Sequence, residues 1–191
     1  MSQSEAFIGF YTLLLGLGIA TLLTRFAEVL RRRQLRAIGL PGALLTLLIV
    51  FEFLSAWSGS TRVFTGVEVT IASLALPFAT GAAYFLATVL LYPEAGDASG
   101  LDVGQYLDAQ TRTIAVLLLL ANALLIAAEV TYVLERWAQS PAYFWRFYLP
   151  YNGAILLLYA TIATFRGRTP RVAAMAMLLL LYGWVTATAQ V

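Results

Sequence analysis

The chain has 191 residues, of which 61% are hydrophobic and 12% charged, and its formal net charge is +2. It contains no Cys and no His, which excludes disulfides, thiolate catalysis and sulfur-ligated metals and removes the commonest metal ligand and general base. We therefore expect no metal, no cofactor and no catalytic residue of these kinds. The small positive charge gives no reason to expect nucleic acid as a partner.

Six apolar segments follow one another along the chain, each near or above the roughly 18 residues of a membrane-spanning helix. They cover residues 6–30, 41–58, 66–92, 113–134, 143–165 and 171–188. Leu, Ala, Ile and Val run through them without alternation, which favours helices over barrel strands of about 9–11 residues. The sequence predicts an all-α polytopic membrane protein: one domain, residues 1–191, built as a bundle of six transmembrane helices.

The first segment is rich in small residues, among them Gly16 and Gly18, which allow a neighbouring helix to approach closely. A basic run follows it directly. Its arginines could bind anionic lipid headgroups, or could act only as a signal for membrane orientation. These candidate headgroup ligands are Arg31, Arg32, Arg33 and Arg36.

Arginine is unevenly divided between the two sides that six crossings would create. One side holds Arg25, Arg31, Arg32, Arg33, Arg36, Arg112, Arg166, Arg168 and Arg171. The other side holds only Arg62, Arg136 and Arg146. The positive-inside rule therefore predicts that both termini lie outside and that the arginine-rich loops are cytoplasmic. Residues 1–5 carry no basic residue ahead of the apolar run, so we do not expect a cleaved signal peptide.

Two carboxylates, Glu52 and Glu129, stand inside apolar segments. A charged acid in hydrocarbon is unfavourable by at least about 2.5 kcal/mol, so such residues are functional candidates. Counting 1.5 Å per residue places both in the outer half of the membrane, at a depth shared with other polar groups. The candidate ligand-binding or ion-binding residues are Glu52, Ser55, Ser73, Glu129, Tyr132, Tyr151 and Asn152.

Two prolines, Pro77 and Pro150, each free a backbone carbonyl near the same depth, which together with the acids favours a polar pocket open to the outside. The alternative interpretation is that both acids are protonated and only hold helices together. Residues 93–110 lack the pattern of a calcium loop and are interpreted as a cytoplasmic connection, of which the last part, residues 102–110, could begin the fourth helix early along the membrane interface. Residues 135–146 have the aromatic composition of a membrane-surface belt or of a lip over a hydrophobic ligand.

The run from Leu14 to Ala20 leading into Leu30-Arg31-Arg32-Arg33, followed by Leu76-Pro77 and by Leu90-Leu91-Tyr92-Pro93, resembles a loose group of uncharacterised bacterial multi-pass inner-membrane proteins of about this size. The resemblance implies a bacterial cytoplasmic membrane and the helix count. It implies no activity and assigns no functional residue.

Three function classes remain open. The first is a small channel or transporter in which Glu52 and Glu129 bind a cation or a proton. The second is a non-catalytic subunit or assembly partner of a larger membrane complex. The third, a lipid-active intramembrane enzyme, has no nucleophile or metal motif to support it. A chain of this length that transports a solute is expected to form a homo-oligomer, and the lipid bilayer is its expected environment.

Overall fold

The computed structural model describes residues 3–63, 70–93 and 103–188, and every element in these ranges is helical. The helices are α1 (Gln3–Arg31), α2 (Leu35–Val63), α3 (Ile71–Val89), α4 (Val103–Ala128), α5 (Val130–Gln139), α6 (Pro141–Tyr143), the π-helix η1 (Phe144–Tyr148), α7 (Leu149–Thr164) and α8 (Arg168–Thr188). The predicted all-α class is confirmed.

Five stretches of the described chain are long and apolar enough to cross a membrane. They are Ile8–Arg31, Arg36–Ser60, Val103–Ala128, Pro141–Thr164 and Arg168–Thr188. The apolar part of α3, Ser73–Val89, is shorter. The protein is therefore a multi-pass membrane protein with five long apolar helices.

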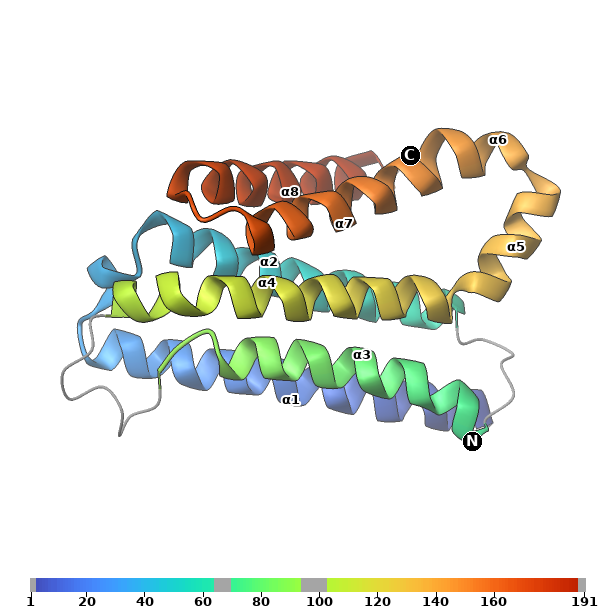
Figure 1. Ribbon diagram of the computed structural model, residues 1–191. Helices are drawn as coiled ribbons and strands as arrows, with labels where there is room; N and C mark the ends of the chain where they lie inside the picture. The colour runs from blue at the N-terminus through green and yellow to red at the C-terminus, as the bar shows by residue number, and fades with distance from the viewer. Residues whose placement is uncertain (1–2, 64–69, 94–102, 189–191) are drawn as a thin grey trace.

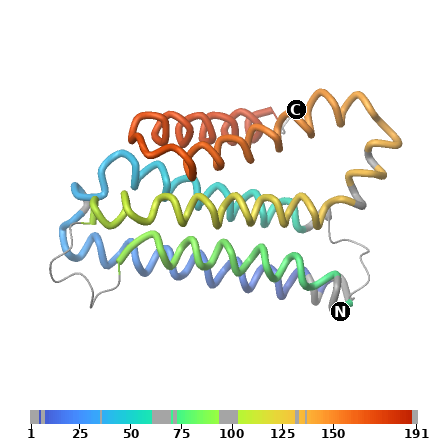
Figure 2. Tube along the Cα trace, viewed as in Figure 1, coloured from blue at the N-terminus to red at the C-terminus, as the bar shows by residue number. Residues whose placement is uncertain are grey.

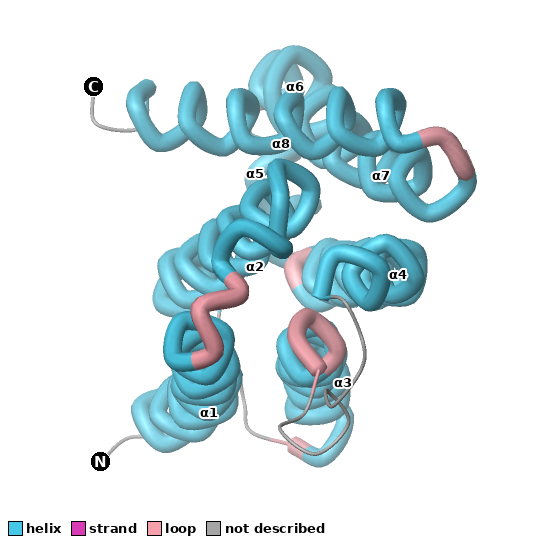
Figure 3. The backbone as a smooth tube through the Cα atoms, turned by 90° about the vertical axis from the view of Figure 1, so that its left-hand side faces the viewer, coloured by secondary structure: helices cyan, strands magenta, loops and turns pink. Residues whose placement is uncertain are grey.

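The long helices form three layers of two, with α1 and α3 in one layer, α2 and α4 in the middle, and α7 and α8 in the third (Figure 1). The end-on view in Figure 3 shows α1 and α2 on one side and α3 and α4 on the other, with α7 and α8 above them and α8 running across both sides. Contacts join α3 to α4, α1 to α3, α4 to α7 and α2 to α8. The middle layer is thus covered on both faces, which places its side chains at the centre of the bundle.

The two ends of the bundle differ. The short turns from α1 to α2 and from α7 to α8 lie at one end of the trace in Figure 2, which we call the turn end. At the other end α5, α6 and η1 project as an arm between α4 and α7, so we call it the arm end. Helix α1 begins and α8 finishes toward the arm end (Figure 1).

Several helices begin or end away from the segments that hydropathy predicts. Helix α4 begins at Val103, ahead of the apolar segment and within the part of the connection, residues 102–110, where the sequence allows an early start; Val103, Leu107 and Thr111 follow one another at helical spacing and are buried. Helix α2 begins before its predicted start, and Gly39 interrupts it with φ of 60°, a conformation that only glycine adopts easily. The segment predicted as residues 113–134 bends at Glu129, between α4 and α5.

The contact between α1 and α2 depends on the absence of a side chain at Gly18. A Cβ atom there would lie only 2.7 Å from one ring carbon of Phe53 and closer still to another, whereas a Cβ atom at Gly16 would meet nothing within 4 Å. Phe53 is fully buried, so its ring has little room to move. We expect Gly18→Ala to destabilise the protein by about 1–3 kcal/mol through overpacking.

Gly16→Ala is the matched control, because it makes the same chemical change two residues away in α1 without a steric clash. Thermal unfolding of both variants in detergent, followed by scanning fluorimetry, measures the difference. Equal melting temperatures for the two variants would contradict the close approach of α1 to Phe53.

Candidate functional site

Glu52 lies at the centre of the bundle and accepts hydrogen bonds from side chains of four other helices. Its Oε1 atom accepts from the Tyr159 and Tyr182 hydroxyls, each at 2.5 Å, and from the Asn122 amide at 3.0 Å. Its Oε2 atom accepts from the Tyr84 hydroxyl at 2.9 Å. Helices α2, α3, α4, α7 and α8 therefore meet at one carboxyl group, and we call these five residues the Glu52 network.

The carboxyl group at the centre of the network is closed to solvent, because Glu52 is only 1% exposed and Tyr84 and Tyr159 are fully buried. All four donors are uncharged, so the carboxyl group is held by hydroxyl and amide dipoles instead of a neighbouring cation. An ionised carboxylate can accept all four bonds, whereas a protonated one needs a tyrosine oxygen to accept its proton. A tyrosine hydroxyl can turn to do so. The network can therefore exist with or without the proton after small rotations.

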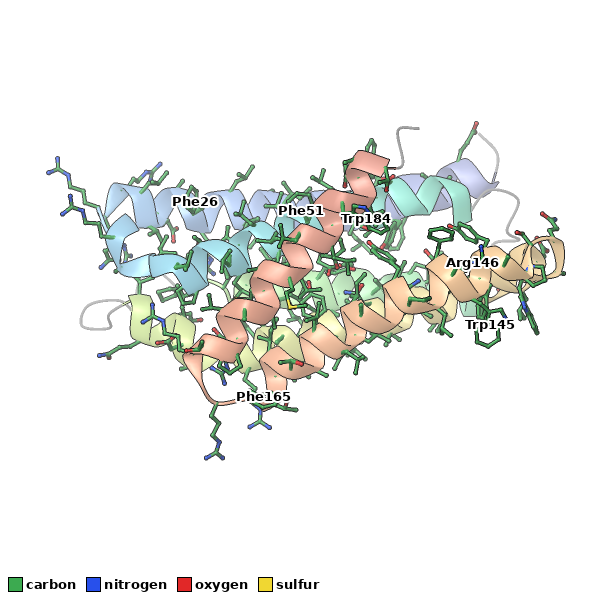
Figure 4. All side chains as sticks on the ribbon, turned by 90° about the horizontal axis from the view of Figure 1, so that it is seen from above. Phe26, Phe51, Trp145, Arg146, Phe165 and Trp184 are labelled. Atoms are coloured by element: carbon green, nitrogen blue, oxygen red, sulfur yellow. The ribbon has the colours of Figure 1, made fainter. Side chains whose placement is uncertain are left out.

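A cavity of about 840 Å³ lies next to this network at the arm end. Its walls come from α2, α4, α5, α6, η1, α7 and α8, and Asn122 and Tyr182 of the Glu52 network form part of its lining. In Figure 4 α7 and α8 diverge from the turn at Phe165, and Arg146 and Trp184, which both line the cavity, lie on different sides of the space between these helices. The volume is within the roughly 300–1,000 Å³ range of small-molecule sites.

Aromatic rings make up much of the cavity wall, so we call it the aromatic pocket. The rings that line it are those of Trp137, Tyr143, Phe144, Phe147, Tyr148, Tyr151, Tyr182 and Trp184. Phe144 stacks on Tyr148 with ring centroids 5.8 Å apart and contacts Trp137 at the same distance. These contacts fix the rings of the arm relative to one another.

The π-helix η1 determines where the aromatic side chains of the arm point. Leu149 donates its backbone N–H to the carbonyl of Phe144, five residues earlier, and Pro150 next to it has no N–H to continue an ordinary α-helical pattern. Asn152 donates its side-chain amide to the Tyr148 carbonyl at 3.0 Å, which satisfies a polar group of this irregular segment. Pro150, which the sequence predicts to free a backbone carbonyl, thus directly follows the π-helical turn.

Glu129 is the acidic side chain of the aromatic pocket. It is half-buried at the bend between α4 and α5, and one of its oxygens accepts from the Tyr148 hydroxyl at 3.5 Å, the longest distance that still counts as a hydrogen bond. Its other oxygen lies near Gly59, where a Cβ atom would be 3.7 Å away. Arg146, the basic residue of the lining, is by contrast exposed. The pocket is therefore lined by a carboxylate that accepts one long hydrogen bond and by an exposed guanidinium cation.

The structure brings together four of the residues that the sequence proposes as ligands, since Ser55, Glu129, Tyr151 and Asn152 all line the aromatic pocket. Glu52 does not line it and lies behind Asn122 and Tyr182. Ser73 is elsewhere, at the first turn of α3, where it forms a reciprocal capping box with Thr70. The Tyr132 side chain lies outside the described residues.

The headgroup candidates Arg31, Arg32, Arg33 and Arg36 are exposed at the turn end, apart from the aromatic pocket. Sequence reasoning did not identify the donors to Glu52. A signal for three of them exists in the chain: Tyr84, Tyr159 and Tyr182 each stand inside an apolar helix, and a buried tyrosine hydroxyl needs a partner. Asn122 gives the same signal in α4, where it also donates to the Leu118 carbonyl at 3.0 Å.

None of the described residues forms a cluster of three or more acids that could hold a metal ion. Comparisons with protein-family models, with curated proteins and with solved structures found no match to this chain.

Proposed function

We propose that this protein is a small membrane transporter that binds an amphipathic organic cation in the aromatic pocket. The observation that carries the proposal is the position of Glu129: a half-buried carboxylate, held by one long hydrogen bond, on the wall of an aromatic cavity. A cation placed there would be attracted by the carboxylate and by the faces of the surrounding rings. Arg146 opposes this attraction less, because its exposed guanidinium is screened by solvent.

The Glu52 network supports a transport role because it connects the pocket to the rest of the bundle. Asn122 and Tyr182 both line the pocket and bond to Glu52, so a ligand that displaces either side chain changes the hydrogen bonds of Glu52. Those bonds also reach α3 and α7 through Tyr84 and Tyr159. Ligand entry and protonation of Glu52 would then bias the same helix contacts, which is what coupled transport requires.

We propose that the protein crosses the cytoplasmic membrane of a bacterium six times, with both termini outside. In this arrangement α3 serves as the sixth span; its packing between α1 and α4 supports this assignment. The arginine-rich turn end then faces the cytoplasm and the aromatic pocket opens outward. A chain of 191 residues has few helices with which to alternate access alone, so the transporter is proposed to act as a homo-oligomer.

Binding can be tested with two probes of the same shape and opposite charge, tetraphenylphosphonium and tetraphenylborate. Trp137 and Trp184 line the pocket, so a Trp57→Phe/Trp145→Phe background confines the tryptophan fluorescence to the site. We expect tetraphenylphosphonium to change this fluorescence saturably and tetraphenylborate to bind at least about tenfold more weakly. Equal affinity for both probes would contradict the charge assignment, and no binding of either would contradict the proposal.

Transport is tested by uptake of tetraphenylphosphonium into liposomes that contain the protein, with a proton gradient imposed. Glu52→Gln keeps the size of the side chain but cannot bind and release a proton. Because Glu52 lies behind the pocket wall and does not line it, we expect this variant still to bind the cation but to lose the dependence of uptake on the proton gradient. Unchanged gradient-driven uptake in Glu52→Gln would rule out Glu52 as the coupling group.

The second candidate function is that of a non-catalytic subunit of a larger membrane complex. The full set of four donors around Glu52 favours it, because a carboxyl group that is satisfied within the chain can serve to hold five helices together. Native mass spectrometry after gentle extraction distinguishes the two functions. Foreign subunits in stoichiometric amounts would support the subunit role, and a homo-oligomer alone would support the transporter.

A further inference from the structure

A second cavity, of about 280 Å³, lies at the turn end, away from the aromatic pocket. Its lining comes from the start of α2, from α4, and from α8 with the turn that precedes it. The residues that line it are Pro41, Asp108, Thr111, Arg166, Arg168, Arg171, Val172 and Met175, and we call it the arginine pocket. We propose that the arginine pocket binds a phosphate group, as carried by the headgroup of an anionic membrane lipid or by a free phosphate ion.

The charges of the arginine pocket carry this proposal. Three arginines and one acid, Asp108, line it, so positive charge is in excess in a small space. The planar fork of arginine donates two parallel hydrogen bonds and matches the oxygens of a phosphate group. Arginines scattered over an open surface would only indicate membrane orientation. These three arginines, in contrast, line the same cavity.

Two of the arginine side chains are placed by the fold. Arg171 donates its Nε–H to the Phe165 carbonyl at 2.7 Å, which fixes the guanidinium against the turn and leaves its two terminal nitrogens as the remaining donors. Arg168 reaches toward α2, because a Cβ atom at Gly39 would lie 3.8 Å from one of its terminal nitrogens. The site therefore joins the first turn of α8 to the beginning of α2. Helix α8 begins at Arg168, and the partial positive charge of its N-terminus adds to the attraction for an anion.

The depth of the pocket favours a lipid headgroup as the source of the phosphate. Phe165, 55% exposed, lies at the turn between α7 and α8 (Figure 4), and both helices belong to stretches long and apolar enough to cross a membrane. The turn between two such spans lies at the membrane surface. Lipid phosphates occupy this level, and the apolar lining residues Val172 and Met175 face the same cavity. This site is separate from Arg31, Arg32 and Arg33, which are exposed at the neighbouring turn and do not line it.

The test compares two pairs of substitutions that remove the same charge at the same end of the protein. Arg166→Gln/Arg168→Gln changes two exposed arginines of the pocket and leaves the bond of Arg171 intact. Arg31→Gln/Arg32→Gln changes two exposed arginines outside it. Native mass spectrometry of the full chain in an uncharged detergent measures bound phosphatidylglycerol and phosphatidylcholine with the same acyl chains, and titration measures inorganic phosphate.

We expect the pocket pair to weaken phosphatidylglycerol binding at least about tenfold more than the control pair does. If inorganic phosphate shows this difference and phosphatidylglycerol does not, the source is the free ion. Equal effects of the two pairs on both ligands would overturn the proposal, because attraction would then depend on surface charge alone.

Arg166→Lys/Arg168→Lys provides a second variant that keeps the charge and removes the guanidinium forks. It is expected to bind phosphatidylglycerol more weakly than the parent and more strongly than the Gln pair. Binding equal to that of the parent would overturn the bidentate geometry. All variants are compared after gel filtration, so that only monodisperse protein enters the measurement.

Discussion

Glu52→Ala is expected to lower the free energy of unfolding by at least about 4 kcal/mol, because each polar group left buried without a partner is unfavourable by about 1–3 kcal/mol. The substitution leaves the hydroxyls of Tyr84, Tyr159 and Tyr182 and the amide of Asn122 without the acceptor they share. It also opens a cavity at the meeting point of five helices, which adds to the loss.

Thermal unfolding in detergent measures this effect, and a change of about 4 kcal/mol corresponds to a fall in melting temperature of roughly 10 °C for a chain of this size. Glu52→Gln retains an acceptor oxygen and the volume of the side chain, so its melting temperature should lie much closer to that of the parent. Glu135→Ala is the control, since it removes an exposed acid from α5. If the melting temperature of Glu52→Ala equals that of Glu135→Ala, the network does not stabilise the bundle.

Glu129→Gln is expected to weaken binding of tetraphenylphosphonium by at least about tenfold, which corresponds to about 1.4 kcal/mol. The amide keeps the shape of the carboxylate and can still accept from the Tyr148 hydroxyl, so the variant removes mainly the negative charge from the pocket wall. The fluorescence titration on Trp137 and Trp184 measures the change directly. Tetraphenylborate, which the carboxylate repels, should bind no more weakly to this variant than to the parent.

Glu135→Gln supplies the matched control for this measurement. Glu135 is exposed, belongs to the same arm and does not line the aromatic pocket, so the control removes the same charge without touching the site. If Glu129→Gln weakens binding of the cation more than Glu135→Gln does, the difference is due to the position of Glu129 in the pocket. Equal loss of binding in both variants would mean that the cation is attracted by the general charge of the arm, and Glu129 would no longer be its ligand.

The all-α class and five long apolar helices followed from the sequence, because hydrophobic length depends on residues that are neighbours along the chain. The same local reasoning selected Glu52 and Glu129, since an acid inside an apolar run is conspicuous without any structure. It also grouped Ser55, Glu129, Tyr151 and Asn152, which the fold gathers around one cavity. Local signals were weaker at the beginning of α4, where polar residues lower the hydropathy, so the predicted apolar segment begins at residue 113 and only the early start allowed at residues 102–110 anticipates Val103.

The partners of Glu52 were decided by the tertiary structure. Tyr84, Asn122, Tyr159 and Tyr182 are between 32 and 130 residues away along the chain, and only the stacking of three helix layers brings them to one carboxyl group. Ser73 shows the converse, since equal depth by counting residues placed it with the acids, whereas the start of α3 at Ile71 uses its hydroxyl as a cap. Counting along a helix gives depth but not azimuth, so which polar groups face one another is settled by how the helices pack.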